Sequence, residues 1–193
     1  MKVTREQATQ NRDRVLDVAA RLFRERGFDG IGVADLMKSA GLTHGGFYGQ
    51  FGSKEALMTE ACARSFDSTL DTFTKIGGQA TSNPLAAVMQ AYLSQQHRDN
   101  PGSGCVIASL GAETTRQGSS LRRAVTDGTR AMLELFTSFA LGRTKAVKRE
   151  RAVVAYASMV GALVLARAVD DAALSDEILQ AVVTALPGAS SSG

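Results

Sequence analysis

The sequence contains few of the residues from which catalytic, metal or disulfide sites are built. It has two cysteines, two histidines, three prolines and no tryptophan in 193 residues. Two cysteines do not form a disulfide framework, and with only His44 and His97 as imidazoles no zinc site is expected. The chain also lacks a glycine-rich phosphate loop, an HExxH motif and a Ser-His-acid set. We therefore expect neither an enzyme nor a bound cofactor.

The sequence shows no strong targeting or membrane segment. Its first 14 residues are polar and lack the apolar stretch of a secretory signal, so we expect a cytoplasmic protein. One apolar run, residues 152–169, is shorter than the roughly 20 residues of a spanning helix, and Arg167 interrupts its end. Small residues recur in this run at every fourth position, at Ser158, Ala162 and Ala166. This spacing favours helix packing within a soluble protein.

The apolar residues repeat with a helical period from one end of the chain to the other. Hydrophobic residues make up 44% and charged residues 21%, which is typical of a soluble protein with a buried core. The spacing predicts helices over residues 12–27, 33–40, 43–51, 53–78, 84–97, 105–116, 119–141, 147–168 and 175–186, with a loop at 100–104. Gly27 and Gly41 are predicted stop signals, Thr43 and Ser53 predicted caps, and the Gly77-Gly78 pair a predicted break. We predict an all-α fold.

The turn Ala40-Gly41-Leu42-Thr43 has the length and glycine content of a helix-turn-helix. In that motif the first residues of the second helix reach base edges in the major groove. Here these residues are Thr43, His44, Gly45 and Gly46. His44 can donate to a guanine acceptor, and the glycines allow close approach of the backbone. Tyr48 and Lys54 can reach phosphates, although Tyr48 packed on Phe51 and a solvated Lys54 are the plainer alternatives.

The order of residues from 27 to 57 closely resembles the DNA-binding segment of the TetR/AcrR family of bacterial transcriptional regulators. The elements that carry the resemblance are Ala40-Gly41, Tyr48-x-x-Phe51 and Ser53-Lys54-Glu55-x-Leu57. It implies a homodimer with a helix-turn-helix domain over 1–54, an effector-binding and dimerisation domain over 55–188, and a flexible tail over 189–193. It implies contacts with operator DNA at Gly32, Thr43, His44, Gly45, Gly46, Tyr48, Gln50 and Lys54. Gly32 and Gln50 depart from the family, which usually has Thr or Ser at the first position and often His at the second.

The resemblance also implies an effector pocket in the C-terminal region. The candidates are aromatic, methionine and leucine side chains clustered on three helices: Phe66, Leu70, Phe73, Met89, Tyr92, Met132 and Phe136. Each of them can equally be plain core. Cys105 opens a predicted helix, where free amides and the dipole make a thiol a better nucleophile. Residues 100–113 resemble the NemR-like and YxaF-like branch, and in NemR-like members a cysteine near this place senses electrophiles or oxidants. The alternative for Cys105, and more so for Cys62, is a small buried residue.

The last two predicted helices are apolar all round, which indicates burial on every side. A two-fold dimer would supply that cover, with contacts at Ser158, Ala162, Leu163, Ala166, Ile178 and Val182.

The net charge of +3 is concentrated in the N-terminal part of the chain, because residues 1–54 hold nine basic and six acidic side chains and the rest hold thirteen of each. We predict a ligand- or redox-responsive DNA-binding repressor. The alternatives are a helical small-molecule carrier and a protein-interaction adaptor that binds no DNA.

Overall fold

The computed structural model describes residues 4–186, and throughout this range the regular elements are helices. They are α1 (Arg5–Arg26), α2 (Val33–Ser39), α3 (Phe47–Phe51), α4 (Lys54–Gln79), α5 (Pro84–Tyr92), α6 (Gln95–Asp99), α7 (Val106–Thr114), α8 (Ser119–Phe139), α9 (Lys145–Ala168) and α10 (Ala172–Ala185). Two short 3₁₀ helices, η1 (His44–Gly46) and η2 (Pro101–Ser103), complete the order. The all-α prediction is confirmed. The predicted tail over 189–193 lies outside the described residues.

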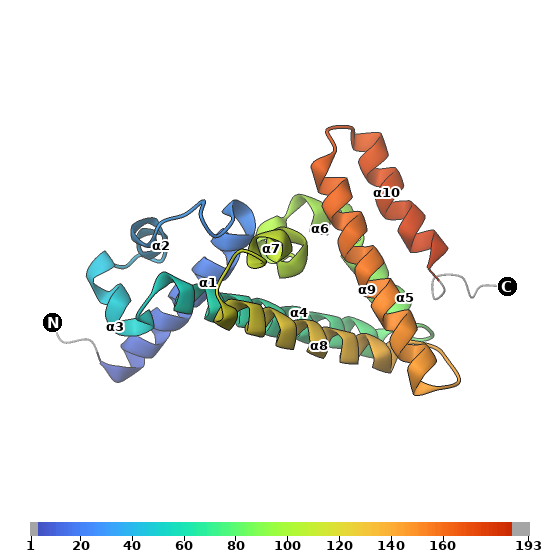
Figure 1. Cartoon of the computed structure of the whole chain (residues 1–193), viewed down its shortest axis with the longest axis horizontal. Helices are drawn as coiled ribbons and strands as arrows, with labels where there is room; N and C mark the ends of the chain where they lie inside the picture. Colours follow the sequence, from blue (N-terminus) through green and yellow to red (C-terminus); the bar gives the residue numbers. More distant parts are fainter. Residues whose placement is uncertain (1–3, 187–193) are drawn as a thin grey trace.

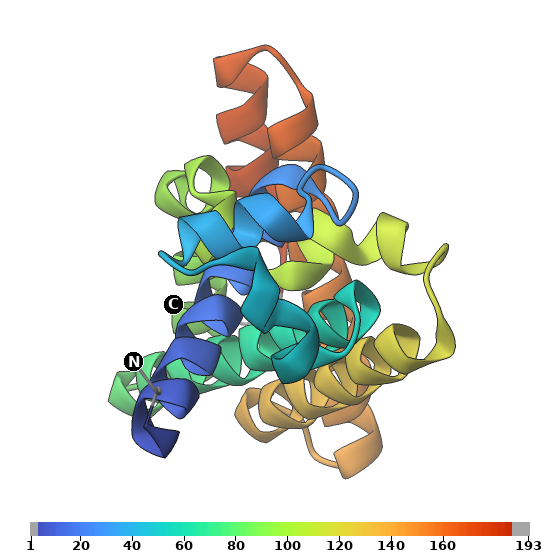
Figure 2. The same cartoon turned by 90° about the vertical axis from the view of Figure 1, so that its left-hand side faces the viewer.

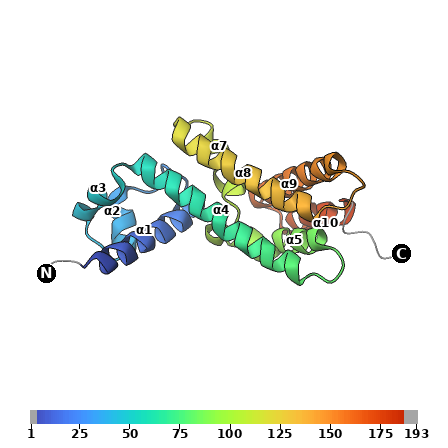
Figure 3. The same cartoon turned by 90° about the horizontal axis from the view of Figure 1, so that it is seen from below.

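Helices α1 to α3 form a unit at one end of the molecule, and α9 and α10 pair at the other end (Figure 1). Helix α4 leaves the N-terminal unit and runs alongside α8, which connects the two ends (Figure 3). Viewed from the N-terminal end, α1, α2 and α3 lie in front of the rest of the molecule (Figure 2). This arrangement leaves the outer side of the N-terminal unit free of the C-terminal helices.

Helix α1 starts earlier than predicted and ends where predicted. The Thr4 hydroxyl accepts the Gln7 backbone N–H over 3.2 Å, and the Gln7 side chain accepts the Thr4 N–H over 3.1 Å. This capping box makes the polar residues before residue 12 helical, so the predicted start was wrong. The stop at Gly27 is confirmed, since its N–H donates to the Phe23 carbonyl over 2.8 Å. Phe28 then folds back, with its ring 5.5 Å from that of Phe23.

The Gly77-Gly78 pair does not break α4, which continues to Gln79. Gly77 is buried, and a Cβ built on it would lie 2.4 Å from Cζ of Phe139 on α8. A Cβ on Gly128 of α8 would similarly lie 2.3 Å from the Phe66 ring on α4. The glycines therefore let α4 and α8 approach closely, and the predicted break was wrong because glycine served packing instead of ending the helix.

The middle of the chain is more finely divided than the sequence pattern predicts. The fifth helix ends at Tyr92, and Ser94 caps a separate helix, α6, by accepting the His97 backbone N–H over 3.2 Å. The predicted loop over 100–104 contains η2. Helix α9 has 24 residues, so by length and composition alone it is long and apolar enough to cross a membrane. It packs against α8 and α10, as the core helix of a soluble protein does.

Candidate nucleic-acid interface and effector cavity

The turn after α2 is built by a glycine in the left-handed region. Gly41 has φ 72°, and its N–H donates to the Lys38 carbonyl over 3.0 Å. The Leu42 N–H donates to the Met37 carbonyl over 2.9 Å. These two hydrogen bonds form the Schellman motif. The motif requires a positive φ at this position, which is unfavourable for residues that have a Cβ atom. The predicted stop at Gly41 is confirmed, and the chain reverses direction into the next element.

The second helix of the motif begins as the 3₁₀ turn η1 and continues as α3. Thr43 precedes it but makes no capping hydrogen bond through its side chain, so that predicted cap was wrong. The exposed hydroxyl of Thr43 is left available to an outside partner. Ser53 does cap α4, as predicted, by accepting the Ala56 N–H over 3.0 Å. This cap places Lys54 in the first turn of α4, next to the motif.

The short η1–α3 element has one buried side and one exposed side. Phe47 and Phe51 are buried, whereas Tyr48 is 61% exposed and touches the Phe47 ring edge-on with centroids 5.1 Å apart. The His44 ring lies 5.9 Å from that of Tyr48, also edge-on. The structure therefore holds Tyr48 outside the core. Gly32, Thr43, His44, Gly45 and Gly46 are also exposed, whereas Lys54 is half-buried.

Gln50 and Arg12 are held within the protein instead of projecting freely into solvent. Gln50 is half-buried, and its Oε1 is buried without a hydrogen-bond partner. Arg12 stacks over the Phe51 ring at 4.8 Å and pairs with Glu60 of α4 at 2.5 Å. Arg64 of α4 pairs in return with Asp17 of α1 at 2.6 Å. Part of the basic excess in residues 1–54 therefore joins α1 to α4.

The predicted effector residues form one aromatic cluster and its surroundings. Phe73 lies between Tyr92 and Phe136, with ring centroids 6.1 and 6.0 Å away, and Phe136 contacts Tyr156 edge-on at 5.6 Å. Phe66, Met132 and Phe136 are buried in the core, and Leu70 packs against it. The Tyr92 hydroxyl is buried without a partner, and burial raises its pKa well above the usual value.

A cavity of about 240 Å³ lies next to this cluster. Its walls come from α4, from α5 and α6, and from residues 103–105, and they include Thr72, Phe73, Tyr92, His97 and Cys105. The structure thus brings three predicted residues, Phe73, Tyr92 and Cys105, to one cavity. Met89 instead lines a separate hollow of about 300 Å³ between α5 and α9.

His97 organises the wall that contains Cys105, and the sequence pattern did not identify it. Its Nδ1 lies 2.7 Å from the Tyr92 carbonyl oxygen, and its Nε2 accepts the Cys105 backbone N–H over 2.9 Å. An accepting Nε2 requires the neutral ring with the proton on Nδ1. Burial lowers the pKa of His97, which agrees with that neutral form. Arg167 donates to the His97 carbonyl over 2.7 Å and secures the segment from α9.

The two cysteines occupy different surroundings. Cys105 is the residue before α7, as predicted, and is buried in the cavity wall with Sγ 4.0 Å from the Tyr156 hydroxyl. Cys62 lies within α4, away from the cavity lining. Burial raises the pKa of the Cys62 thiol to about 12, which makes it a poor nucleophile.

The cavity wall is joined directly to the N-terminal unit. Arg24 of α1 donates from Nε to the Gly102 carbonyl oxygen over 2.9 Å, and its other nitrogens bond to the same oxygen and to the Ser65 hydroxyl. Gly102 belongs to η2, immediately before the cavity residues 103–105. Glu113 of α7 also accepts the Phe28 N–H over 2.8 Å. The segment before Cys105 is therefore hydrogen-bonded to α1 through Arg24, and α7, which follows Cys105, is hydrogen-bonded to the loop after α1 through Glu113.

Three of the predicted dimer contacts face inward. Ala162, Leu163 and Ala166 are at most 4% exposed within the single chain, so they are not free to contact a second copy. Ser158, Ile178 and Val182 are half-buried. The exposed large apolar side chains of α9 are Val147, Val153, Val154, Val164 and Leu165. The exposed face of α9 is therefore opposite to the side that carries Ala162, Leu163 and Ala166.

The chain is similar to known proteins in sequence and in fold. Residues 15–61 match the family described as bacterial regulatory proteins, tetR family. The HTH-type transcriptional repressor NemR of Escherichia coli K12 is 30% identical over 129 residues, which are 65% of each protein. The chain belongs to the TetR family. A second TetR-family relative is the HTH-type transcriptional repressor KstR2 of Mycolicibacterium smegmatis, which is 32% identical over 99 residues, 49% of this chain and 48% of that protein.

Solved TetR-family structures have the same fold over most of the chain. The reduced form of E. coli NemR matches with a TM-score of 0.75 and 24% identity, over 90% of this chain and 93% of that one. A TetR regulator from Chloroflexus aurantiacus matches with a TM-score of 0.77 and 23% identity, over 93% and 95%. The predicted resemblance and fold class are confirmed. The sequence alignment itself spans less than two thirds of NemR.

Proposed function

We propose that this TetR-family protein is a repressor that binds double-stranded operator DNA in the cytoplasm. The observation that carries this proposal is the exposed side of the η1–α3 element, where a tyrosine 61% exposed projects from a helix held by buried phenylalanines. The major groove is about 12 Å wide and admits a helix of this kind. The exposed element sits at the end of the molecule, so a duplex can reach it without meeting the C-terminal helices (Figure 2).

The proposed contact residues divide into base-reading and backbone-contacting groups. Thr43 and His44 present the polar side chains that reach base edges, and Gly45 and Gly46 let the backbone approach them. Tyr48 and Lys54 contact phosphates on either side of the groove. Gly32 supplies a backbone N–H at the start of α2, and half-buried Gln50 contacts the DNA only if its amide rotates outward.

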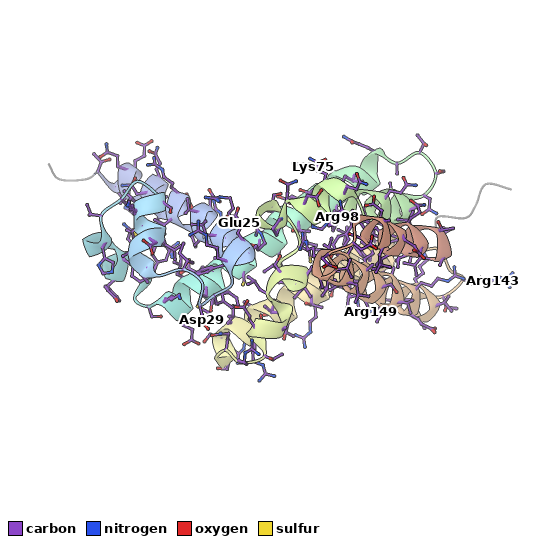
Figure 4. The ribbon with its side chains drawn as sticks, turned by 90° about the horizontal axis from the view of Figure 1, so that it is seen from above. Glu25, Asp29, Lys75, Arg98, Arg143 and Arg149 are labelled. Atoms are coloured by element: carbon purple, nitrogen blue, oxygen red, sulfur yellow. The ribbon has the colours of Figure 1, made fainter. Side chains whose placement is uncertain are left out.

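A gel-shift titration tests this proposal. The probe is the DNA upstream of the protein's own gene, and the variant is Tyr48→Ala combined with Lys54→Ala. We expect the affinity to fall at least tenfold, because two phosphate contacts are removed. The matched control is Lys75→Ala, which removes an exposed lysine on α4 far from α3 (Figure 4). If the double variant binds as tightly as the control, the carrier or adaptor interpretation gains support.

We propose further that the protein acts as a homodimer through the exposed face of α9 and the adjoining face of α10. Val154 and Leu165 are 49% and 57% exposed, and a second copy would bury them. A two-fold dimer would present two η1–α3 elements to successive major grooves, about 34–36 Å apart along the DNA. The operator is then expected to be a near-palindrome.

Release from DNA is proposed to start at the cavity of about 240 Å³. Either a small-molecule effector occupies it, or an electrophile modifies Cys105 in its wall. Both events would displace residues 103–105 and, through Gly102 and Arg24, the first helix of the DNA-binding unit. The effector must bind the released state more tightly than the DNA-bound state to have this effect.

Iodoacetamide distinguishes the cysteine route. The Cys105 thiolate attacks the methylene carbon, a C–S bond forms and iodide leaves, while the thiol proton passes to solvent. We expect the modified wild type to release the upstream DNA and Cys105→Ser to retain it. Cys62→Ser is the matched control and should respond as the wild type does. If wild type and Cys105→Ser release the DNA alike, the thiol is not the sensor.

A further inference from the structure

The connection between α8 and α9 gathers cations at the end of the molecule opposite the α1–α3 unit (Figure 4). A broad hollow of about 1150 Å³ lies between the last turns of α8 and the first turns of α9. Its lining includes five cationic side chains and one acidic one, Glu134; the cations are Arg130, Arg143, Lys145, Lys148 and Arg149. The hollow therefore carries a formal excess of four positive charges.

Four of these cations have no acidic partner among the residues that the structure describes. Arg143, Lys145, Lys148 and Arg149 make no ion pair with any residue in the described range 4–186. Arg130 pairs only with Asp127, at 3.3 Å on the exposed surface of α8. Other exposed cations of the described range, such as Lys75, Arg122 and Arg123, also lack an ion pair. The hollow differs from them because it brings four unpaired cations together in one lining.

The position of these cations on α9 is itself unfavourable. Lys145, Lys148 and Arg149 lie in the first two turns of a 24-residue helix, whose amino end already carries partial positive charge. The first turn contains no acidic residue to offset them. Hydroxyls from Thr137, Ser138 and Thr144 add polar groups to the same hollow. A sequence that keeps like charges together against a helix dipole breaks a local rule, and such departures are expected at functional sites.

We propose that this hollow binds a compact anion with several phosphate groups, such as a free polyphosphate chain or the polyphosphate part of a nucleotide. Several linked phosphates can neutralise four unpaired cations at once. Arg143 and Arg149 can each hold two phosphate oxygens through their guanidinium forks, while the lysines act as point charges. The site is separate from the proposed operator-binding surface, so it adds a second anionic ligand to a protein proposed to bind DNA.

Isothermal titration calorimetry on the full chain tests the proposal with sodium tripolyphosphate as the probe. We expect saturable binding of one tripolyphosphate per chain in 50 mM NaCl, weakened at least tenfold in 300 mM NaCl because salt screens exposed charges. The variant Lys148→Gln combined with Arg149→Gln should weaken binding at least tenfold. The matched control, Arg122→Gln with Arg123→Gln, removes two exposed cations of α8 outside the hollow and should stay within twofold of wild type.

Other ligands distinguish the source of the phosphates. Equal affinity for tripolyphosphate and ATP would identify the polyphosphate moiety as the ligand, and tighter binding of ATP would assign the site to a nucleotide. Absence of saturable binding in 50 mM NaCl, or equal loss in the hollow and control variants, would overturn the proposal. Displacement of tripolyphosphate by a 30-base-pair duplex would overturn it in favour of a second nucleic-acid surface. Circular dichroism establishes that each variant is folded, and the operator gel shift reports separately on DNA binding.

Discussion

Replacement of Arg24 by methionine tests the link between the cavity wall and the N-terminal unit. Arg24→Met keeps an unbranched apolar stem but removes the guanidinium charge and its hydrogen bonds to the Gly102 carbonyl and the Ser65 hydroxyl. No carboxylate pairs with this guanidinium in the described residues, and burial lowers its pKa. Its stabilising contribution therefore depends on these neutral oxygens. Gly102 is buried, so its carbonyl would lose both bonds without access to water.

The expected magnitude follows from opposing contributions. Hydrogen bonds to a charged group contribute about 1.5–3 kcal/mol each, and a buried acceptor left without a partner costs about 1–3 kcal/mol. Methionine avoids the several kcal/mol that desolvation of a guanidinium costs. We expect a net loss of about 2 kcal/mol of unfolding free energy. For a chain of this size that is a fall in Tm of about 4–8 °C.

Thermal unfolding followed by circular dichroism at one fixed protein concentration measures this loss. The matched control is Arg21→Met, on the same helix, which removes an exposed ion pair with Glu25. Exposed pairs contribute about 0–1 kcal/mol, so the control should shift Tm by less than about 4 °C. If Arg24→Met and Arg21→Met unfold at the same temperature, the Arg24–Gly102 contact does not hold the two parts together.

Three further predictions concern packing, pH and assembly. Gly128→Ala should lose about 1–2 kcal/mol, because its methyl group would overlap the Phe66 ring, whereas Gly78→Ala, with open space, should gain about 0.5–1 kcal/mol in denaturant unfolding. The free energy of unfolding should fall as the pH drops below about 6.5, because His97 takes up a proton in the unfolded chain at a higher pH than it does when buried. The contribution of one such group to the slope of unfolding free energy against pH is at most about 1.4 kcal/mol per pH unit, and His97→Gln should reduce that slope. Leu165→Glu should leave the circular dichroism spectrum unchanged but give a monomer in sedimentation, and a dimer of this variant would move the interface elsewhere.

Local signals predicted some helix ends correctly, although the predicted start of α1 and the Thr43 cap were wrong. The stop at Gly27 and Phe28, the stop at Gly41 and the cap at Ser53 each depend on neighbours within a few residues, and all three are present. Gly77 has the same composition signal as a stop, but its surroundings are set by Phe139, which is distant in the sequence. The spacing of residues in the sequence does not show that the Phe139 ring of α8 packs against Gly77 of α4.

The cavity could be predicted only in part for the same reason. Phe73 and Tyr92 follow from helical periodicity, and Cys105 follows from its place at a helix start. His97 and Arg24 act through partners that the periodicity does not connect, because Arg24 reaches Gly102, 78 residues later. From the sequence pattern, a histidine at the end of a predicted helix and an arginine on a polar helix face are both expected to be exposed to solvent. Their role depends on η2, which the sequence pattern treats as a loop.

Helix α9 shows why three residues predicted to contact a second copy are buried within the single chain. The stretch from Val153 to Val169 is apolar on all sides, and composition alone cannot say which side meets the chain's own core. Contacts with α8 and α10 select the side with Ala162, Leu163 and Ala166, because small residues allow helices to pack closely. The larger Val164 and Leu165 remain exposed on the opposite side. The apolar composition of the segment therefore cannot identify the exposed face of α9, because the contacts of the folded chain decide which side is buried.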